Sequence, residues 1–383
     1  MRYLIALLVL PLLLGGCGLS ASGSAAAEAS PVAVVETDIP PIPPTEPAAP
    51  PTATPALLVA TIAPATDTPL PPTATATSAP PTNTPTPAPP TATPTPDPVA
   101  GLTIPDLRTR AYGSEGDINI GEIYNYGAGY TTYRISYPAD GLRLTGLLHV
   151  PDGAGPFPVI IANRGHIDRA IYQPGMDSRA FSDVMARNGY LVVAPDYRGY
   201  AGGDEGPNPF YTGYYADVIN LIPMAQRLPM ARPGKVGMWG HSRGASITVA
   251  ATTILTDQIA AAVVYAPAPA DLAEDYYRRY RQSGGNPGSD TWPFPPEANP
   301  DAYRRVSPIN YMDVVDAPVM LHHGTADTVV DVSASVAIAD TLRALGKDVT
   351  LYTYEGAGHA LQGQYEQLYF QRTVDFFRQH MGE

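Results

Sequence analysis

From about residue 130 to the C-terminus, short apolar runs alternate with longer amphipathic segments. Apolar runs of about four to eight residues are typical of buried strands, and apolar positions at helical spacing are typical of helices. The expected strands are 132–137, 142–150, 158–162, 190–194, 236–239, 259–265, 318–321 and 349–354. The expected helices are 177–188, 211–228, 243–256, 332–345 and 364–380. This alternation predicts an α/β fold: a mostly parallel, twisted, eight-stranded sheet with helices on both faces and an antiparallel edge made by the first two strands.

One pentapeptide, Gly240-His241-Ser242-Arg243-Gly244, lies between an expected strand and an expected helix. In that context Gly-x-Ser-x-Gly is a nucleophile elbow, in which the serine sits on a strained turn and the glycines let the backbone fold tightly. The pattern predicts that Ser242 is a catalytic nucleophile rather than a structural turn serine.

A nucleophilic serine requires a base and an acid, and both follow it in the chain order Ser, Asp, His. Asp327 comes just after the expected strand 318–321, and His359 lies in a glycine-flanked loop after the strand 349–354. Open α/β sheets carry their sites at the carboxyl ends of strands, so both side chains are expected beside Ser242. Asp327 is expected to orient the imidazole of His359.

Other residues compete for these two roles. His322 and His323 end a strand next to the acid loop and are alternative bases. Asp331 and Asp271 are alternative acids. Structural roles are expected for three further histidines: His149, His241 and His380.

Acyl transfer also requires hydrogen-bond donors for the developing oxyanion. One expected donor is the backbone N–H of Arg243, and the other is the N–H of His166 in the loop after the strand 158–162, with Gly165 as the alternative. The side chains of Arg164 and Arg243 either steer an acidic substrate or anchor their loops through salt bridges.

Further motifs accompany the elbow and the Asp and His loops. They are Tyr137-Pro138-Ala139-Asp140-Gly141-Leu142, Gly146-Leu147-Leu148-His149-Val150-Pro151, Ala194-Pro195-Asp196-Tyr197-Arg198-Gly199-Tyr200, Ser307-Pro308-Ile309-Asn310-Tyr311, His323-Gly324-Thr325-Ala326-Asp327 and Gly358-His359. With these motifs, the chain from about residue 133 resembles an α/β-hydrolase, nearest to the catalytic domain of the prolyl oligopeptidase family and its dienelactone-hydrolase-like relatives. The resemblance implies a serine peptidase or esterase.

The chain departs from that family in three places. Arg164 and His166 stand where relatives usually have the first and third residues of His-Gly-Gly or His-Gly-Tyr, and Ala245 stands where many have a second glycine after the elbow. Prolyl oligopeptidases proper also carry a large β-propeller before the hydrolase domain. The sequence ahead of residue 133 predicts no such propeller.

After the sixth strand, hydrolases of this kind place a cap over the site. Here residues 266–307 follow the expected sixth strand and form such an insertion. Its aromatic residues, Trp292 and Phe294 among them, either line the substrate pocket or pack the cap. The segment 104–130 is expected to pack on the flank of the domain.

The N-terminus begins with Met1-Arg2-Tyr3 and an apolar run over residues 4–14, which is too short for a stable membrane span and predicts a secretory signal over residues 1–16. Leu14-Gly15-Gly16-Cys17 resembles a bacterial lipobox, in which the cysteine is acylated; the alternative is ordinary cleavage beside an incidental cysteine. Cys17 is the chain's one cysteine, so no disulfide can form within it. Lipid on Cys17 predicts a membrane anchor.

Residues 17–100 are dominated by proline, threonine and alanine. Such a segment favours extended polyproline conformations and predicts a tether with a reach on the order of 100–200 Å. Threonines in such a stretch are candidate glycosylation sites. The tether predicts display at the cell surface, ahead of a hydrolase domain at 101–383.

A formal charge of −13 excludes nucleic acid as an expected partner, and no Cys/His cluster or phosphate-binding glycine loop indicates a metal or cofactor. The expected function is therefore hydrolysis of an ester or amide through an acyl-enzyme, without a cofactor. The function expected first is that of a peptidase acting on short peptides. The second alternative is a carboxylesterase or deacetylase, and the third is a lipid-anchored binding protein on an inactive hydrolase fold.

Overall fold

The computed structural model describes residues 96–382. The signal peptide expected at 1–16, Cys17 and the tether as far as residue 95 lie outside the described residues. Within 96–382, no helix is both long enough and apolar enough to span a membrane.

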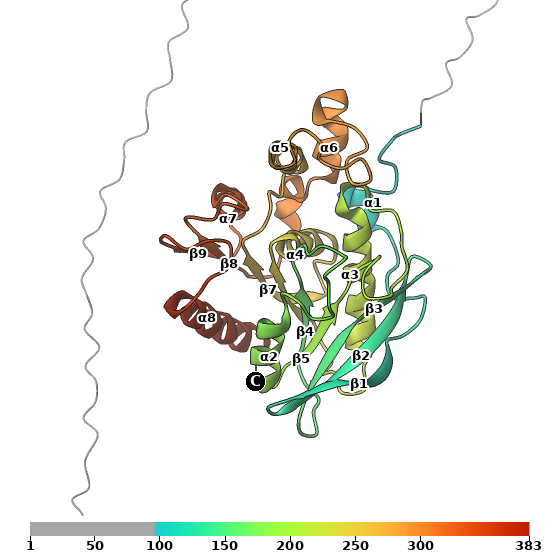
Figure 1. Cartoon of the computed structure of the whole chain (residues 1–383), viewed down its shortest axis with the longest axis vertical. Coiled ribbons are helices and arrows are strands. Elements are labelled where there is room, and N and C mark those ends of the chain that lie inside the picture. The colour runs from blue at the N-terminus through green and yellow to red at the C-terminus, as the bar shows by residue number, and fades with distance from the viewer. Residues whose placement is uncertain (1–95, 383) are drawn as a thin grey trace, which may run out of the picture. The chain divides into compact units, whose positions relative to one another are not determined.

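One nine-stranded sheet forms the centre of the domain (Figure 1). Its strand order is β1-β2-β3-β5-β4-β6-β7-β8-β9, with antiparallel pairing from β1 to β5 and parallel pairing from β5 to β9. The strands are β1 (Asn119–Gly127), β2 (Tyr130–Ala139), β3 (Leu142–Pro151), β4 (Val159–Asn163), β5 (Leu191–Pro195), β6 (Val236–His241), β7 (Ile259–Tyr265), β8 (Val319–Gly324) and β9 (Val349–Tyr354). The mostly parallel α/β sheet is as predicted.

The strand count differs from the prediction of eight because β1 was missed. Asn119–Gly127 carries no alternation of apolar and polar residues, and seven of its nine positions are exposed. It pairs with β2 at the edge of the sheet, where one side of the strand has no neighbour. Edge strands bury little, so their sequence shows a weak hydrophobic pattern.

Helices cover both faces of the sheet. The cluster that includes Phe181 and Phe377 places α2 (Arg179–Arg187) and α8 (Gln364–Met381) on one face. The other face packs against α3 (Thr212–Gln226), α4 (Arg243–Ile254) and α7 (Ser333–Ala344). Figure 1 shows the two groups on opposite sides of the sheet. Strands β4, β5, β6 and β8 are buried along their whole length, which explains their continuous apolar runs.

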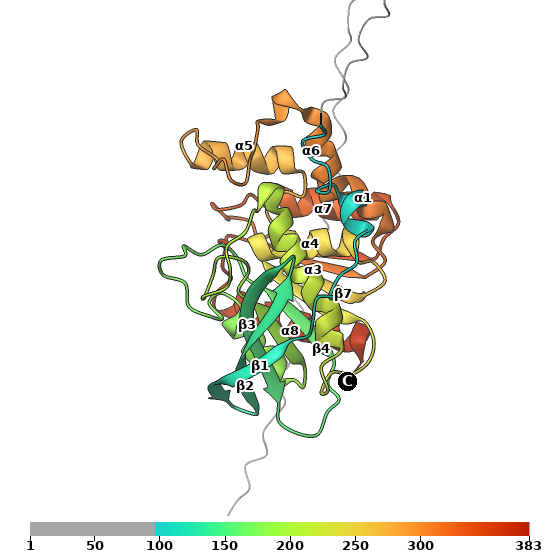
Figure 2. The same cartoon turned by 90° about the vertical axis from the view of Figure 1, so that its right-hand side faces the viewer.

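The expected insertion follows β7. It contains α5 (Leu272–Gln282), the 3-10 turn η2 (Pro296–Ala298) and α6 (Pro300–Val306), and it leads into η3 (Pro308–Val314). Figure 2 shows α5 and α6 beyond one end of the sheet. Trp292 and Phe294 both pack against Phe210, which belongs to η1 (Pro209–Tyr211), so these aromatics serve packing. Ahead of β1, α1 (Ile104–Arg108) packs against α4, and Arg108 Nε donates to the Thr253 carbonyl at 2.7 Å.

A buried ion pair fixes the turn that follows β5. Asp217 of α3, with no exposed surface, accepts from Arg198 Nη2 at 2.6 Å, from Arg198 Nε at 3.0 Å and from the Arg198 backbone N–H at 2.9 Å. Removing one partner of such a pair leaves an uncompensated buried charge.

We therefore expect Asp217→Ala to lower the free energy of unfolding by about 3–5 kcal/mol in urea denaturation. The control is Asp340→Ala, which breaks the exposed Asp340–Arg343 pair on α7 and is expected to change that free energy by less than about 1 kcal/mol. Equal effects of the two substitutions would contradict the role given to the buried pair.

Candidate active site

Ser242 occupies the sharp turn between β6 and α4. Its backbone angles are φ 54° and ψ −119°, a strained conformation for a residue with a side chain. A Cβ on Gly240 would overlap the Gly244 carbonyl oxygen, and a Cβ on Gly244 would overlap the Asn163 carbonyl oxygen. Both glycines are thus required by close backbone approach, and the elbow predicted from the sequence has the expected shape.

The loops after β8 and β9 bring Asp327 and His359 together. His359 Nδ1 lies 2.6 Å from Asp327 Oδ2. The other carboxylate oxygen, Oδ1, accepts from the N–H groups of Val329 at 2.8 Å and Val330 at 3.0 Å. Burial raises the pKa of Asp327, but the hydrogen bonds from His323 and His359 outweigh it and hold that pKa well below the ordinary value. The carboxylate is therefore ionised and fixed in orientation.

His323 is a further partner of this carboxylate. Its Nε2 lies 3.1 Å from Asp327 Oδ2 and 3.0 Å from the Val330 carbonyl oxygen, and its Nδ1 lies 2.7 Å from Ser335 Oγ. Both partners of Nε2 accept, so Nε2 carries a proton. Buried beneath the loop, His323 supports Asp327 rather than competing with His359 as a base.

The remaining alternatives have other roles. His322 is fully buried, and its Nδ1 lies 2.8 Å from Tyr354 Oη. Asp331 accepts from the Ser333 N–H at 2.9 Å, and Asp271 caps α5 by accepting from the Ala273 N–H at 2.8 Å.

Ser242 and His359 line the same pocket, a cavity of about 280 Å³. The insertion contributes part of its wall through Arg278, Arg279, Pro287 and Thr291. Within residues 96–382 no hydrogen bond joins Ser242 to His359. In unliganded enzymes such bonds are often long and tighten when substrate binds.

Gly165 and His166, the two candidate oxyanion donors in the loop after β4, differ in what their N–H groups do. Gly165 N–H donates to Asp177 Oδ2 at 2.6 Å, so it is already engaged. His166 lines the pocket, and its N–H has no acceptor among the described residues. Arg243 is the first residue of α4, where N–H groups have no intrahelical partner. The structure thus leaves His166, rather than Gly165, free to act with Arg243.

The sequence reasoning missed a pair behind the elbow, formed by Asp177 and His241. His241 Nδ1 lies 2.8 Å from Asp177 Oδ1, and its Nε2 lies 3.2 Å from the His359 carbonyl oxygen. Burial lowers the pKa of His241, but the Asp177 carboxylate outweighs it, and the net shift is upward. With Gly165 also bound to Asp177, this pair joins the oxyanion loop, the elbow and the His359 loop. The histidine at the second position of Gly-x-Ser-x-Gly was the available signal.

Both arginines considered as substrate guides are tied to the protein. Arg164 is 2% exposed, and its guanidinium lies over the rings of Tyr172 and Tyr200 at 4.2 and 3.9 Å. Arg243 Nη2 pairs with Asp275 Oδ2 at 2.8 Å, and its guanidinium lies 3.6 Å from the centre of the Tyr211 ring. Arg243 therefore anchors its segment through a salt bridge, as in the second alternative. Arg164 is also anchored, but through aromatic rings and the carbonyl oxygens of Gly165 and Asp196; it forms no salt bridge within residues 96–382.

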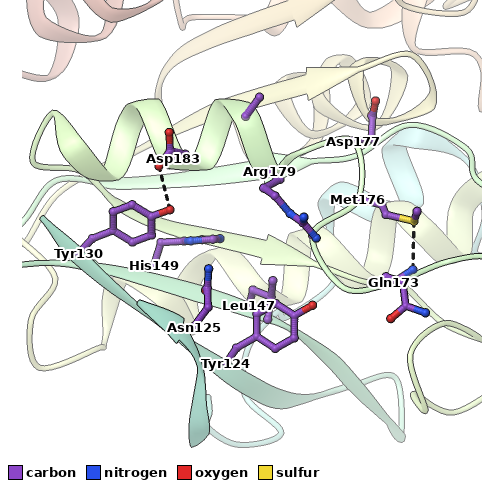
Figure 3. A pocket seen from close by; sticks show the side chains of 12 residues that line it. Tyr124, Asn125, Tyr130, Leu147, His149, Gln173, Met176, Asp177, Arg179 and Asp183 are labelled. Atoms are coloured by element: carbon purple, nitrogen blue, oxygen red, sulfur yellow. Dashed lines mark hydrogen bonds between the residues drawn. The ribbon is translucent and has the colours of Figure 1, made fainter. Parts of the chain in front are cut away.

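A larger cavity, of about 1140 Å³, lies away from Ser242 between α2 and the sheet (Figure 3). Its wall includes His149, Tyr130 and Arg179, and Tyr130 Oη donates to Asp183 Oδ1 at 3.0 Å. No serine or cysteine lines it, so this cavity offers no counterpart of the nucleophile in the smaller pocket. Among residues 96–382, no group of His, Cys, Asp and Glu is arranged to hold a metal.

A model of the prolyl oligopeptidase family matches residues 178–383, more than half of the chain and the whole region from α2 onwards. The chain belongs to the prolyl oligopeptidase family. The resemblance seen in the motifs is thereby confirmed. As a member of this family, the chain is a serine hydrolase of the peptidase and esterase kind.

Its relatives include both kinds of enzyme. An uncharacterized peptidase of Bacillus subtilis, YtmA, is 27% identical over 235 residues, which are 59% of this chain and 85% of that protein. A putative carboxymethylenebutenolidase of Synechocystis is 24% identical over 243 residues, or 60% of this chain and 85% of that protein.

Solved structures show the same fold. A putative dipeptidyl aminopeptidase IV from Bacteroides ovatus is 20% identical with a TM-score of 0.56, over 66% of this chain and 36% of that one. The acylaminoacyl peptidase of Pyrococcus horikoshii is 21% identical with a TM-score of 0.56, over 67% and 43%. Acetyl xylan esterase 1 of Thermoanaerobacterium is 15% identical with a TM-score of 0.52, over 68% and 88%. The chain thus spans 36% of the length of the Bacteroides ovatus protein and 43% of that of the Pyrococcus horikoshii peptidase.

The Asp177–His241 pair predicts a particular dependence of stability on pH. The pKa of His241 is raised in the folded protein. The stabilisation that its charged ring gives to the folded state is therefore complete below about pH 6.5 and is lost as pH rises through the folded-state pKa. Burial raises the pKa of Asp177, but His241 and the Gly165 N–H lower it overall. The stabilisation that the ionised Asp177 gives to the folded state is therefore complete above about pH 4 and is lost as pH falls through the folded-state pKa.

We expect Asp177→Asn to destabilise the protein most between about pH 4 and 6.5, and progressively less at higher pH. Urea denaturation at pH 5, 7 and 9 measures this. Asp183→Asn, on α2 and paired with the non-titrating Arg187, is the control and should show no such trend. A loss for Asp177→Asn that stays constant from pH 5 to 9 is inconsistent with a charged His241.

Proposed function

We propose that Ser242, His359 and Asp327 form the catalytic triad of this hydrolase. The observation that carries the proposal is the meeting of a strained elbow serine and an aspartate-bound histidine in one pocket, although the three residues come from loops after three different strands. Such a constellation is what acyl transfer requires.

In this mechanism Ser242 Oγ attacks the carbonyl carbon of an ester or amide. His359 Nε2 takes the hydroxyl proton and returns it to the leaving group, while Asp327 holds the ring through Nδ1 and stabilises the imidazolium. The N–H groups of Arg243 and His166 donate to the oxyanion. Water then attacks the acyl-enzyme and releases Ser242, with His359 again as base.

The proposed substrates are short peptides. The family match and the 27% identity to the Bacillus subtilis peptidase support a peptidase. The insertion residues that line the pocket, together with its volume of about 280 Å³, support a small substrate, since this is the low end of the range for ligand pockets.

The second candidate is a carboxylesterase or deacetylase. It is supported by the match to the Synechocystis carboxymethylenebutenolidase-like protein and by the acetyl xylan esterase, 88% of whose length this chain covers. That coverage fits a hydrolase domain that works without a propeller.

The triad predicts the outcome of labelling with a fluorophosphonate probe. The protein should label, while Ser242→Ala and His359→Ala should lose labelling and lower the turnover of any substrate by about 10⁴-fold or more, because the members of a triad act as a unit. Asp327→Asn should lower turnover by on the order of 10⁴-fold. Ser289→Ala and His380→Ala, outside the pocket lining, are the matched controls and should label like the parent. A folded parent protein that does not label contradicts the proposal.

The same preparation separates the two substrate classes. Turnover of alanyl p-nitroanilides or short peptides supports the peptidase. Hydrolysis of p-nitrophenyl acetate with no turnover of any peptide substrate contradicts it and supports the esterase.

We also propose that the enzyme is a lipoprotein held on the outer side of a membrane by Cys17 and carried on the Pro/Thr-rich tether. The apolar run before Leu14-Gly15-Gly16-Cys17 and the absence of any other cysteine from the sequence support this. Two or three acyl chains on one residue give stable anchoring.

Expression in a bacterial host should therefore place the full chain in the membrane fraction and incorporate labelled palmitate. Cys17→Ser should abolish the incorporation and release the protein from membranes. Cys17→Ser protein that still incorporates palmitate would count against acylation at this position.

A further inference from the structure

Three arginines line the pocket that holds Ser242 and His359: Arg243, Arg278 and Arg279. No aspartate or glutamate lines it. The chain as a whole carries a formal charge of −13, so a cationic pocket runs against its overall charge. A local excess of positive charge around a nucleophile attracts anionic substrates.

One buried carboxylate neutralises part of this charge. Asp275 of α5 has no exposed surface; its Oδ2 pairs with Arg243 at 2.8 Å and its Oδ1 with Arg278 at 2.6 Å. Arg278 also donates to Gln282 Oε1 at 2.8 Å. Two guanidinium groups thus share a single negative charge, and both are held in place by the protein.

Arg279 has no such partner. It is partly buried in the last turn of α5, and within residues 96–382 its guanidinium makes no salt bridge and no hydrogen bond. Its charge acts across the pocket: burial first, and then the charges of Arg279 and Arg243, lower the pKa of His166. A second group in the same pocket lining is also unsatisfied, because the buried Nη1 of Arg243 has no acceptor among the described residues.

We propose that the substrate carries a carboxylate near the scissile bond and that Arg279 binds it. The inference rests on the proposed function, whose substrate class it narrows to acids: peptides with a free C-terminal carboxylate close to the cleaved bond, or half-esters of dicarboxylic acids. A guanidinium presents a planar fork of donors that matches a carboxylate, and it does so better in a partly buried pocket than in water.

The size of the pocket limits where the carboxylate sits. A cavity of about 280 Å³ contains both Ser242 and Arg279, so the reacting carbonyl and the carboxylate are separated by a few bonds. Short peptides and half-esters satisfy this limit.

The test uses the full chain and two pairs of substrates that differ only in charge. The acyl-side pair is p-nitrophenyl hydrogen succinate and methyl p-nitrophenyl succinate. The leaving-group pair is trialanine and trialanine amide. We expect kcat/KM to favour the charged member of at least one pair by about 10- to 100-fold, the range for hydrogen bonds to a charged group. Added salt should reduce this preference.

Substitutions assign the preference to one residue. Arg279→Gln should reduce it to within about twofold, and Arg279→Lys should keep part of it, because the charge remains while the fork is lost. Arg281→Gln is the matched control: Arg281 lies two residues further along α5, carries the same charge and does not line this pocket, so the preference should persist. A parent protein that treats both pairs alike, or an Arg279→Gln protein that keeps the preference, overturns the inference.

Binding of glutarate, measured by calorimetry, tests the inference without catalysis. The parent and Ser242→Ala should bind glutarate, and Arg279→Gln should bind it at least tenfold more weakly. Binding that depends on Arg279 in a protein that neither labels nor turns over substrate rejects the triad but supports the anion site. Labelling and turnover with no charge preference and no glutarate binding reject the anion site but leave the triad intact.

Discussion

The carboxylate of Asp327 accepts four hydrogen bonds, two from the backbone of its own loop and two from histidines on either side of it. The loops after β8 and β9 are joined through this group, and the direction of the His359 ring follows from it. His323 supports the carboxylate from below and is itself held by Ser335 of α7. The geometry around the nucleophile therefore depends on a negative charge that is desolvated yet fully hydrogen-bonded.

A second carboxylate, that of Asp177, holds the backbone around the elbow in place. Asp177 holds the Gly165 N–H and the His241 ring, and His241 reaches the His359 carbonyl oxygen. The strained turn at Ser242 is thus braced by hydrogen bonds from neighbouring loops, as strained conformations at active sites require. Asp177 thus holds the backbone around the elbow in place, and Asp327 holds the ring of His359.

The sequence alone located most of the fold and the three residues proposed as the triad, since each of these follows a strand with a clear apolar run. It missed β1, because an exposed edge strand has no hydrophobic pattern to read. It also missed Asp177 and the supporting role of His323. Asp177 lies 64 positions from His241, and no local spacing signals such a partnership. The sequence also could not predict that Arg279 lacks a partner, because this is known only once the positions of all neighbouring side chains are known.

Asp275 has a mechanical consequence. Its carboxylate links the insertion, through its own helix, to Arg243, the residue next to the nucleophile. Any outward movement of the insertion as a lid therefore has to separate a fully buried carboxylate from Arg243. A displacement of α5 is transmitted through this ion pair to the residue beside Ser242, so the position of the insertion and the shape of the elbow are coupled.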